Sequence, residues 1–191
     1  MAGLFITVSG PPGCGGTTVA EGVANALDYE LVSGGDIFRE LAEERDMTLT
    51  QYIAKAEEGD EIDRALDRRL SAIIEDRGED EGFVLESRLA GWLAGTEADL
   101  RIWLDAPTEV RIERLQNRDD EFESELRVRE ESERGRYEDY YSIDISDTSF
   151  YDLTMNTSRW SPETVVALVL DAIQSYDPAH DEGAFDVDLD V

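Results

Sequence analysis

A glycine-rich stretch, GPPGCGGTT, occupies residues 10–18 and has the spacing of a phosphate-binding loop. Gly10 and Gly15 stand at the two glycine positions of the pattern G-x-x-x-x-G-K-[ST], and Thr17 supplies the hydroxyl. The position of the usual lysine holds Gly16. Because such a loop binds phosphate mainly through backbone N–H groups at a helix N-terminus, we expect phosphate binding without the lysine. A plain glycine-rich turn between a strand and a helix is the alternative.

The elements around this loop alternate along the chain. Short apolar segments predict strands at residues 4–9, 29–33, 82–87, 100–106 and 151–156. Segments of helical periodicity lie between them, which predicts a parallel sheet covered by helices on both faces. Ligands of such sheets bind outside the carboxyl ends of the strands. The loop follows the first predicted strand and opens a helix, so it lies where a phosphate site is expected.

Several helix starts are marked by capping residues. Asp36 is predicted to cap the helix that follows the second strand. Thr48 and Gln51 have the spacing of a capping box, and Ser161 followed by Pro162 predicts the start of the last helix.

Length and composition indicate one domain with a hydrophobic core. The chain has 191 residues, of which 41% are hydrophobic. Its single cysteine, Cys14, excludes an intrachain disulfide and favours a reducing compartment, so we expect a cytoplasmic protein. The first ten residues lack a basic segment and predict a strand instead of a signal peptide. No apolar run is long enough to span a membrane, and we expect no membrane partner.

The chain is strongly acidic. Its formal net charge is -29, from 46 acidic and 17 basic residues, and Lys55 is its only lysine. Such a surface repels nucleic acid, so none is expected as a partner. Self-repulsion of this size is best tolerated where salt screens it, which favours a protein from a halophilic, high-salt cytoplasm. An acidic protein that binds basic partners is the alternative.

Five further sequence blocks follow the loop along the chain. They are SGGDIFRE (33–40), LESRLAGWLAG (85–95), WLDAPTEVRIERL (103–115), REESERGRYEDYYSIDISD (129–147) and YDLTMNTSRW (151–160). Together with the loop, they closely resemble archaeal cytidylate kinases, a branch of the nucleoside-monophosphate kinases. The resemblance spans about residues 4–176, and the first two blocks are its most specific parts.

The resemblance implies a three-layer α/β/α P-loop kinase fold with a five-stranded parallel sheet. It places a monophosphate-binding insert near 36–75 and a mobile lid near 119–144 within a single domain, 1–176. Residues 177–191 lie beyond the resemblance; they contain six acidic residues and no lysine or arginine, which predicts an acidic, flexible tail. The implied reaction is phosphoryl transfer from ATP to CMP or dCMP, with Mg²⁺ as the metal and small-molecule nucleotides as the partners.

Site residues follow from the same resemblance, position by position. The ATP phosphates would be held by Gly10, Pro11, Pro12, Gly13, Cys14, Gly15, Gly16, Thr17 and Thr18. The CMP side would comprise Ser33, Gly34, Asp36, Arg39 and Arg88. Mg²⁺ would be held by the Thr17 hydroxyl and, through a water, by Glu86. Two lid arginines, Arg129 and Arg136, would be brought onto the transferring phosphoryl group as catalytic residues.

Simpler roles remain open for several of these residues. Arg136 lies in a glutamate-rich stretch and could form only local i,i+4 pairs, and Glu86 could only orient Arg88. Cys14 is expected to be a small filler, although a loop thiol near a helix N-terminus could have a lowered pKa and be redox-sensitive. The tryptophans are expected in the core; they are Trp92, Trp103 and Trp160. His180, the only histidine, lies in the tail and is expected to be solvated.

The glycine at position 16 leaves two hypotheses about activity. Loss of the lysine removes a positive charge that follows the moving phosphoryl group, so catalysis should suffer more than ATP binding. An active but slowed kinase is the first hypothesis, with an arginine elsewhere, such as one in the lid, as a candidate substitute. The second is a nucleotide-binding regulator or sensor that has lost phosphoryl transfer.

Overall fold

The computed structural model describes residues 3–78, 81–116 and 133–181. Five parallel strands form one sheet at nearly the predicted positions, in the order β2-β3-β1-β4-β5. Their bounds are β1 (Phe5–Ser9), β2 (Glu30–Ser33), β3 (Phe83–Glu86), β4 (Leu100–Asp105) and β5 (Leu153–Asn156). Every residue of β1 is buried, as expected for the central strand of a sheet covered on both faces.

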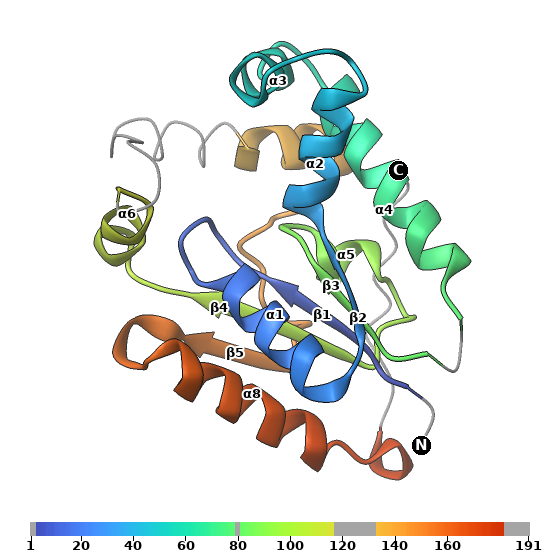
Figure 1. Ribbon diagram of the computed structural model, residues 1–191, viewed down its shortest axis with the longest axis vertical. Helices are drawn as coiled ribbons and strands as arrows, with labels where there is room; N and C mark the ends of the chain where they lie inside the picture. Colours follow the sequence, from blue (N-terminus) through green and yellow to red (C-terminus); the bar gives the residue numbers. More distant parts are fainter. Residues whose placement is uncertain (1–2, 79–80, 117–132, 182–191) are drawn as a thin grey trace.

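Helices cover both faces of this sheet, as Figure 1 shows. They are α1 (Gly16–Leu27), α2 (Gly34–Glu43), α3 (Leu49–Ala56), α4 (Glu61–Asp76), α5 (Ala90–Leu93), α6 (Thr108–Gln116) and α8 (Pro162–Ser175), with a further helical segment at 133–141. Two short 3-10 turns follow β5 and α8; they are η1 (Thr157–Arg159) and η2 (Pro178–His180).

Alternation along the strands divides the core into two. Ile6 and Val8 face the cluster that β1 shares with α1 and α8, whereas Phe5 joins the cluster packed under α2, α3, α4 and α5. Because successive side chains of a strand point to opposite faces, one apolar strand supplies both cores. The predicted three-layer α/β/α arrangement is therefore confirmed.

The predicted helix starts are confirmed at two of three places. Thr48 and Gln51 form the capping box of α3, and the Ser161 hydroxyl accepts from the Thr164 N–H at the start of α8. The prediction for Asp36 is wrong. Since α2 continues directly from β2 with Ser33 at its N-cap, Asp36 lies in the first helical turn.

The predicted insert lies within the described residues, but only part of the predicted lid does. Helices α2, α3 and α4 stand together beyond the sheet edge that carries β2 and β3, and they span most of the predicted insert (Figure 1). Residues 117–132 lie outside the described part of the chain, and with them most of the predicted lid. Among the residues that the structure describes, no helix has both the length and the apolar character needed to cross a bilayer.

Candidate active site

The glycine-rich loop joins the carboxyl end of β1 to the N-terminus of α1. Gly13 has φ 78° and Gly15, at the N-cap of α1, has φ 97°, a left-handed conformation that glycine adopts readily. A Cβ on Gly13 would lie 2.7 Å from the Arg111 carbonyl oxygen. Glycine at these two positions is therefore required by backbone conformation and by a close approach to α6.

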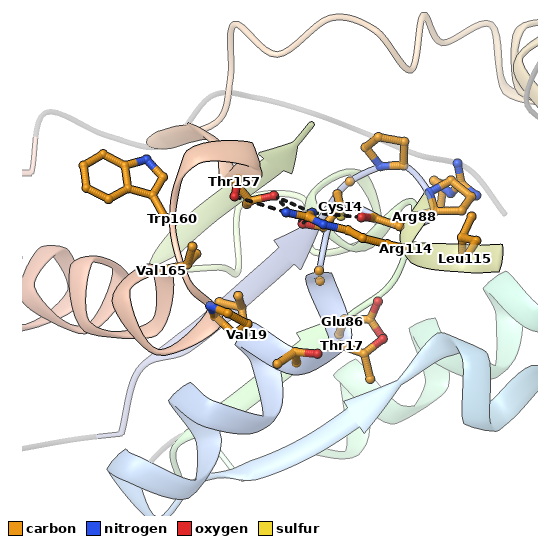
Figure 2. A pocket seen from close by; sticks show the side chains of 18 residues that line it. Cys14, Thr17, Val19, Glu86, Arg88, Arg114, Leu115, Thr157, Trp160 and Val165 are labelled. Carbon is orange, nitrogen blue, oxygen red and sulfur yellow. Dashed lines mark hydrogen bonds between the residues drawn. The ribbon is translucent and has the colours of Figure 1, made fainter. Parts of the chain in front are cut away.

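A cleft of about 560 Å³ opens at this loop (Figure 2). All nine residues predicted to hold the ATP phosphates line it, from Gly10 to Thr18. Glu86 and Arg88 border it at the end of β3, whereas Arg114 and Trp160 border it at the side of α6 and α8. The cleft therefore lies at the carboxyl ends of the central strands, where the sequence placed the ligand.

Gly16 is the first residue of α1. Its φ is not in the left-handed region, so the backbone accepts a side chain there. A Cβ at this position would lie 3.3 Å from Glu86 Oε1 and 3.6 Å from Cys14 Sγ. A side chain at position 16 would therefore point toward the Glu86 carboxylate, which would have to shift slightly to make room for it. Lys55, the only lysine, is an exposed residue of α3 and does not border the cleft.

The Glu86 carboxylate stands beside the loop. Ser33 Oγ donates to Glu86 Oε2 at 2.8 Å, so Ser33, which the sequence placed on the CMP side, orients this carboxylate. Burial raises the pKa of Glu86, while the Ser33 hydrogen bond and the charge of Arg88 oppose the rise. A shielded carboxylate with an oxygen toward the loop, near the exposed Thr17 hydroxyl, is a donor set of the hard oxygen type that Mg²⁺ prefers.

Two arginines expected to hold the acceptor phosphate follow neighbouring strands. Arg39 lies on α2 after β2, pairs with Asp36, and has a side chain that is 57% exposed. Arg88 follows β3 and pairs with Glu133 Oε2 at 2.9 Å. Gly34 starts α2 where a Cβ would come within 2.8 Å of the Ser87 hydroxyl. The structure thus brings both arginines to one edge of the sheet.

Arg136 has a partner outside its own helix. Its Nε donates to Asp63 Oδ2 on α4 at 2.7 Å, so the hypothesis that its charge serves only local i,i+4 pairs is wrong. Nearby, the Tyr141 hydroxyl donates to Asp67 Oδ2 at 2.6 Å. These contacts join the segment 133–141 to α4.

Two buried carboxyl groups lie in this joint. Burial raises the pKa of Asp67 to about 7, against the opposing Tyr141 hydrogen bond. Burial also raises the pKa of Asp63, although the Arg136 charge counteracts it. Arg129, the other expected lid arginine, lies outside the described residues.

Among the predictions about single side chains, the one for Trp160 is wrong, and those for Trp103, Cys14 and His180 are confirmed. Trp103 is buried, as expected, but Trp160 is 50% exposed at the rim of the cleft, because it ends η1 before α8 turns back onto the sheet. Cys14 is 3% exposed, and burial raises the pKa of its thiol to about 11. Its role as a small filler is confirmed, and a lowered pKa is excluded because desolvation outweighs the loop hydrogen bond. His180 is exposed, as expected.

Sequence reasoning missed two arginines of α6. Arg111 and Arg114 reach back about a hundred residues along the chain to carbonyl oxygens of the glycine-rich loop. The only available signal was their three-residue spacing, which puts both on one face of the helix after β4.

Known proteins of similar sequence are cytidylate kinases. The cytidylate kinase-like family is matched over residues 5–159. The chain belongs to this family. A cytidylate kinase from Halobacterium salinarum is 52% identical over 94% of both chains, and one from Pyrococcus horikoshii is 44% identical over 95% of this chain and 94% of its own. The similarity to relatives from halophilic archaea fits the acidic composition.

Solved structures share the fold with lower sequence identity. A shikimate kinase from Acinetobacter baumannii has a TM-score of 0.61 and 19% identity, and covers 91% of this chain and 94% of its own. A gluconokinase from Sinorhizobium meliloti has a TM-score of 0.59 and 16% identity, and covers 92% of this chain and 98% of its own. These similarities confirm the P-loop kinase fold.

Proposed function

We propose that the protein transfers the γ-phosphoryl group of ATP to CMP or dCMP and releases ADP with CDP or dCDP. The observation that carries this proposal is the arrangement of the phosphate loop, Glu86 and Arg88 around one strand-end cleft. Arg39 lies outside the lining of this cleft, on α2 after the neighbouring strand. The cytidylate kinases to which the chain is 52% identical over almost its whole length support the same reaction.

On the donor side, the loop would bind the ATP phosphates through backbone N–H groups and the positive end of α1. The Thr17 hydroxyl and the Glu86 carboxylate are the groups that would hold Mg²⁺, Glu86 through a water. When bound, Mg²⁺ neutralises charge that develops on the phosphate oxygens. The Ser33 hydroxyl keeps the Glu86 carboxylate oriented toward this position.

On the acceptor side, Arg39 and Arg88 would grip the CMP phosphate in a bidentate manner. Each arginine now pairs with a carboxylate, Asp36 or Glu133, which the incoming phosphate would replace. The acceptor phosphate is itself the nucleophile, so the reaction needs no general base. Arg129 and Arg136 would add positive charge at the transferring group, after Arg136 leaves Asp63.

A nucleotide-binding regulator without turnover is the second hypothesis, and no observation favours it. Its basis was Gly16 alone, whereas the loop, Glu86 and Arg88 occupy consistent positions around the cleft. A cytoplasmic location and the absence of nucleic acid as a partner stay predictions.

The test is direct measurement of product in molar KCl. Purified protein is incubated with ATP, Mg²⁺ and each of CMP, dCMP, UMP and AMP, and the diphosphates are separated by chromatography. We expect CDP or dCDP in amounts equal to the ADP released. No turnover with any of the four acceptors, together with intact ATP binding, would favour the regulator.

A further inference from the structure

Two arginines of α6 donate hydrogen bonds to the carbonyl oxygens of three successive peptide units in the glycine-rich loop. Arg111 Nη1 donates to the Pro12 oxygen at 3.1 Å. Arg114 Nη1 lies 3.1 Å from the Gly13 oxygen and 3.3 Å from the Cys14 oxygen. The two arginines therefore fix the direction of the carbonyl groups in the middle of the loop.

The direction of the carbonyl groups sets the direction of the N–H groups. The described chain contains no cis peptide bond, and in a trans unit the N–H points opposite to the C=O. The N–H groups of Gly13, Cys14 and Gly15 consequently point away from the arginines. The Cys14 N–H closes a turn onto the Pro11 oxygen at 3.1 Å, and those of the two glycines remain for a ligand.

Thr157, at the start of η1, completes this arrangement (Figure 2). Its hydroxyl donates to the Cys14 oxygen at 2.7 Å and accepts from Arg114 Nη1 at 2.9 Å. Arg114 Nη2 also donates to the Thr157 carbonyl oxygen at 3.2 Å. Thr157 is 3% exposed and Arg111 6% exposed, so these are interior contacts.

We propose that Arg111, Arg114 and Thr157 form a carbonyl clamp, a set of positioning residues that keeps the loop N–H groups aimed at the ATP phosphates. Gly13 and Gly15 impose little resistance to rotation of the peptide units beside them. A rotated unit would present a carbonyl oxygen to the phosphates in place of an N–H. The clamp opposes that rotation, and its guanidinium groups add positive charge behind a loop that lacks the usual lysine. The proposal rests on the ATP site of the proposed function.

The sharpest variant is Arg111→Met. Arg111 does not border the cleft, so it has no direct contact to offer a nucleotide there. Besides the Pro12 oxygen of the loop it bonds to the Ala106 oxygen and the Thr108 hydroxyl at the start of α6. We expect ADP and ATP to bind about tenfold more weakly by calorimetry in molar KCl, the usual scale for one charge-assisted hydrogen bond, with CMP affinity unchanged. The matched control is Arg69→Met, which removes an equal charge from an ion pair with Glu44 on the surface of the insert.

Thr157→Val provides a second variant of similar shape that removes only the hydroxyl. It should also weaken ADP and ATP more than CMP, and it decides the question if Arg111→Met fails to fold. A merely structural role would lower the melting temperature and weaken ADP and CMP alike, and that result overturns the clamp. Unchanged ADP affinity in a folded Arg111→Met protein overturns it as well.

Failure of the clamp and failure of the proposed function give different results, because ADP binding is measured without turnover. A wild-type protein that binds ADP but forms no CDP contradicts the kinase activity and leaves the clamp measurable. A wild-type protein that forms CDP, together with unchanged ADP binding in both variants, contradicts only the clamp.

Discussion

The donor side and the acceptor side of the candidate site hold their arginines in different ways. On the donor side, Arg114 bonds to backbone carbonyl oxygens of the glycine-rich loop and to Thr157. On the acceptor side, Arg39 pairs with the Asp36 carboxylate and Arg88 with that of Glu133. A carbonyl oxygen of the main chain stays in place when a nucleotide arrives, whereas a side-chain carboxylate can be exchanged for a phosphate.

This difference suggests two separate tasks for one residue type. The donor-side arginines shape a binding surface made of N–H groups, so their effect on phosphate is indirect. The acceptor-side arginines are themselves the expected phosphate ligands, and their carboxylate partners hold them ready until CMP binds. Substitutions on the two sides should therefore affect different kinetic parameters.

The largest effect is expected at position 16. Because the loop N–H groups already serve the ground state, Gly16→Lys should raise kcat by roughly a hundredfold while changing ATP affinity little. The helical φ accepts the side chain, and only Glu86 must give way. Steady-state kinetics with saturating CMP measures this change.

Asn25→Lys is the matched control, since it adds the same charge to an exposed position of α1. Unchanged, already high turnover in Gly16→Lys would mean that another residue has replaced the lysine. Undetectable turnover in the wild type and in Gly16→Lys would favour the binding-only regulator.

The next effect concerns the acceptor side. Arg39→Ala and Arg88→Ala should each weaken CMP binding by about tenfold or more, as expected for loss of a charged hydrogen bond, and should spare ATP binding. Calorimetry with CMP and with ADP measures both affinities. Equal CMP affinity in Arg39→Ala and wild type would contradict the assignment and remove the contrast between the two sides.

A smaller effect is expected in the joint between α4 and the segment 133–141. The pKa of Asp67 is raised to about 7 in the fold, so the folded state binds its proton more tightly than the unfolded state does. The stability contribution of this group is therefore full at low pH and declines as the pH rises from about 4 toward 7 and above. Asp67→Asn should abolish this decline, on the order of 2 kcal/mol between pH 5 and pH 8.

The change in the free energy of unfolding between pH 5 and pH 8 is measured by urea unfolding of the wild type and of Asp67→Asn, both in the same molar KCl. Asparagine can still accept from the Tyr141 hydroxyl, so the comparison isolates the charge. Asp139→Asn, an exposed change in the same segment, is the control. An equal pH dependence in all three proteins would exclude the buried carboxyl group as its cause.

The smallest effect is expected from the acidic tail. Truncation after Tyr176 removes 177–191, of which the described residues, 177–181, are all exposed. The lost contacts include the hydrogen bond that Tyr176 Oη donates to Asp181 Oδ2 at 2.7 Å. Affinities for ADP and CMP should stay within about twofold of wild type. FDVDLDV, at residues 185–191, alternates apolar and acidic residues as an edge strand would, so a large loss of affinity would show that the tail is needed.

Local signals explain what could be predicted from the sequence. The glycine-rich loop, the capping box at Thr48 and Gln51, and the Ser161 cap depend on residues a few positions apart. The strands were recognised because a parallel sheet buries continuous apolar runs. The Asp36 cap was misplaced because nothing in the glycines before it shows that the helix already begins there.

Contacts across the fold explain what could not be predicted. The partners of Arg111 and Arg114 lie about a hundred positions away, and no periodicity of α6 indicates that an arginine will bond to a main-chain oxygen. Trp160 was expected in the core because tryptophan is mostly apolar, yet the turn after β5 leaves it at the rim of the cleft. Whether a tryptophan such as Trp160 is exposed depends on the three-dimensional arrangement of the elements around the cleft, and amino-acid composition contains no information about it.

The burial of Cys14 has a practical consequence for anyone studying this loop. It is the only cysteine of the chain, and with a pKa of about 11 its thiol stays protonated and shielded at neutral pH. Alkylation by a maleimide therefore requires the loop to open first. The rate of labelling in the native protein reports how often that opening occurs, without any engineered probe. Slower labelling with ADP present would express nucleotide binding as a change in local opening.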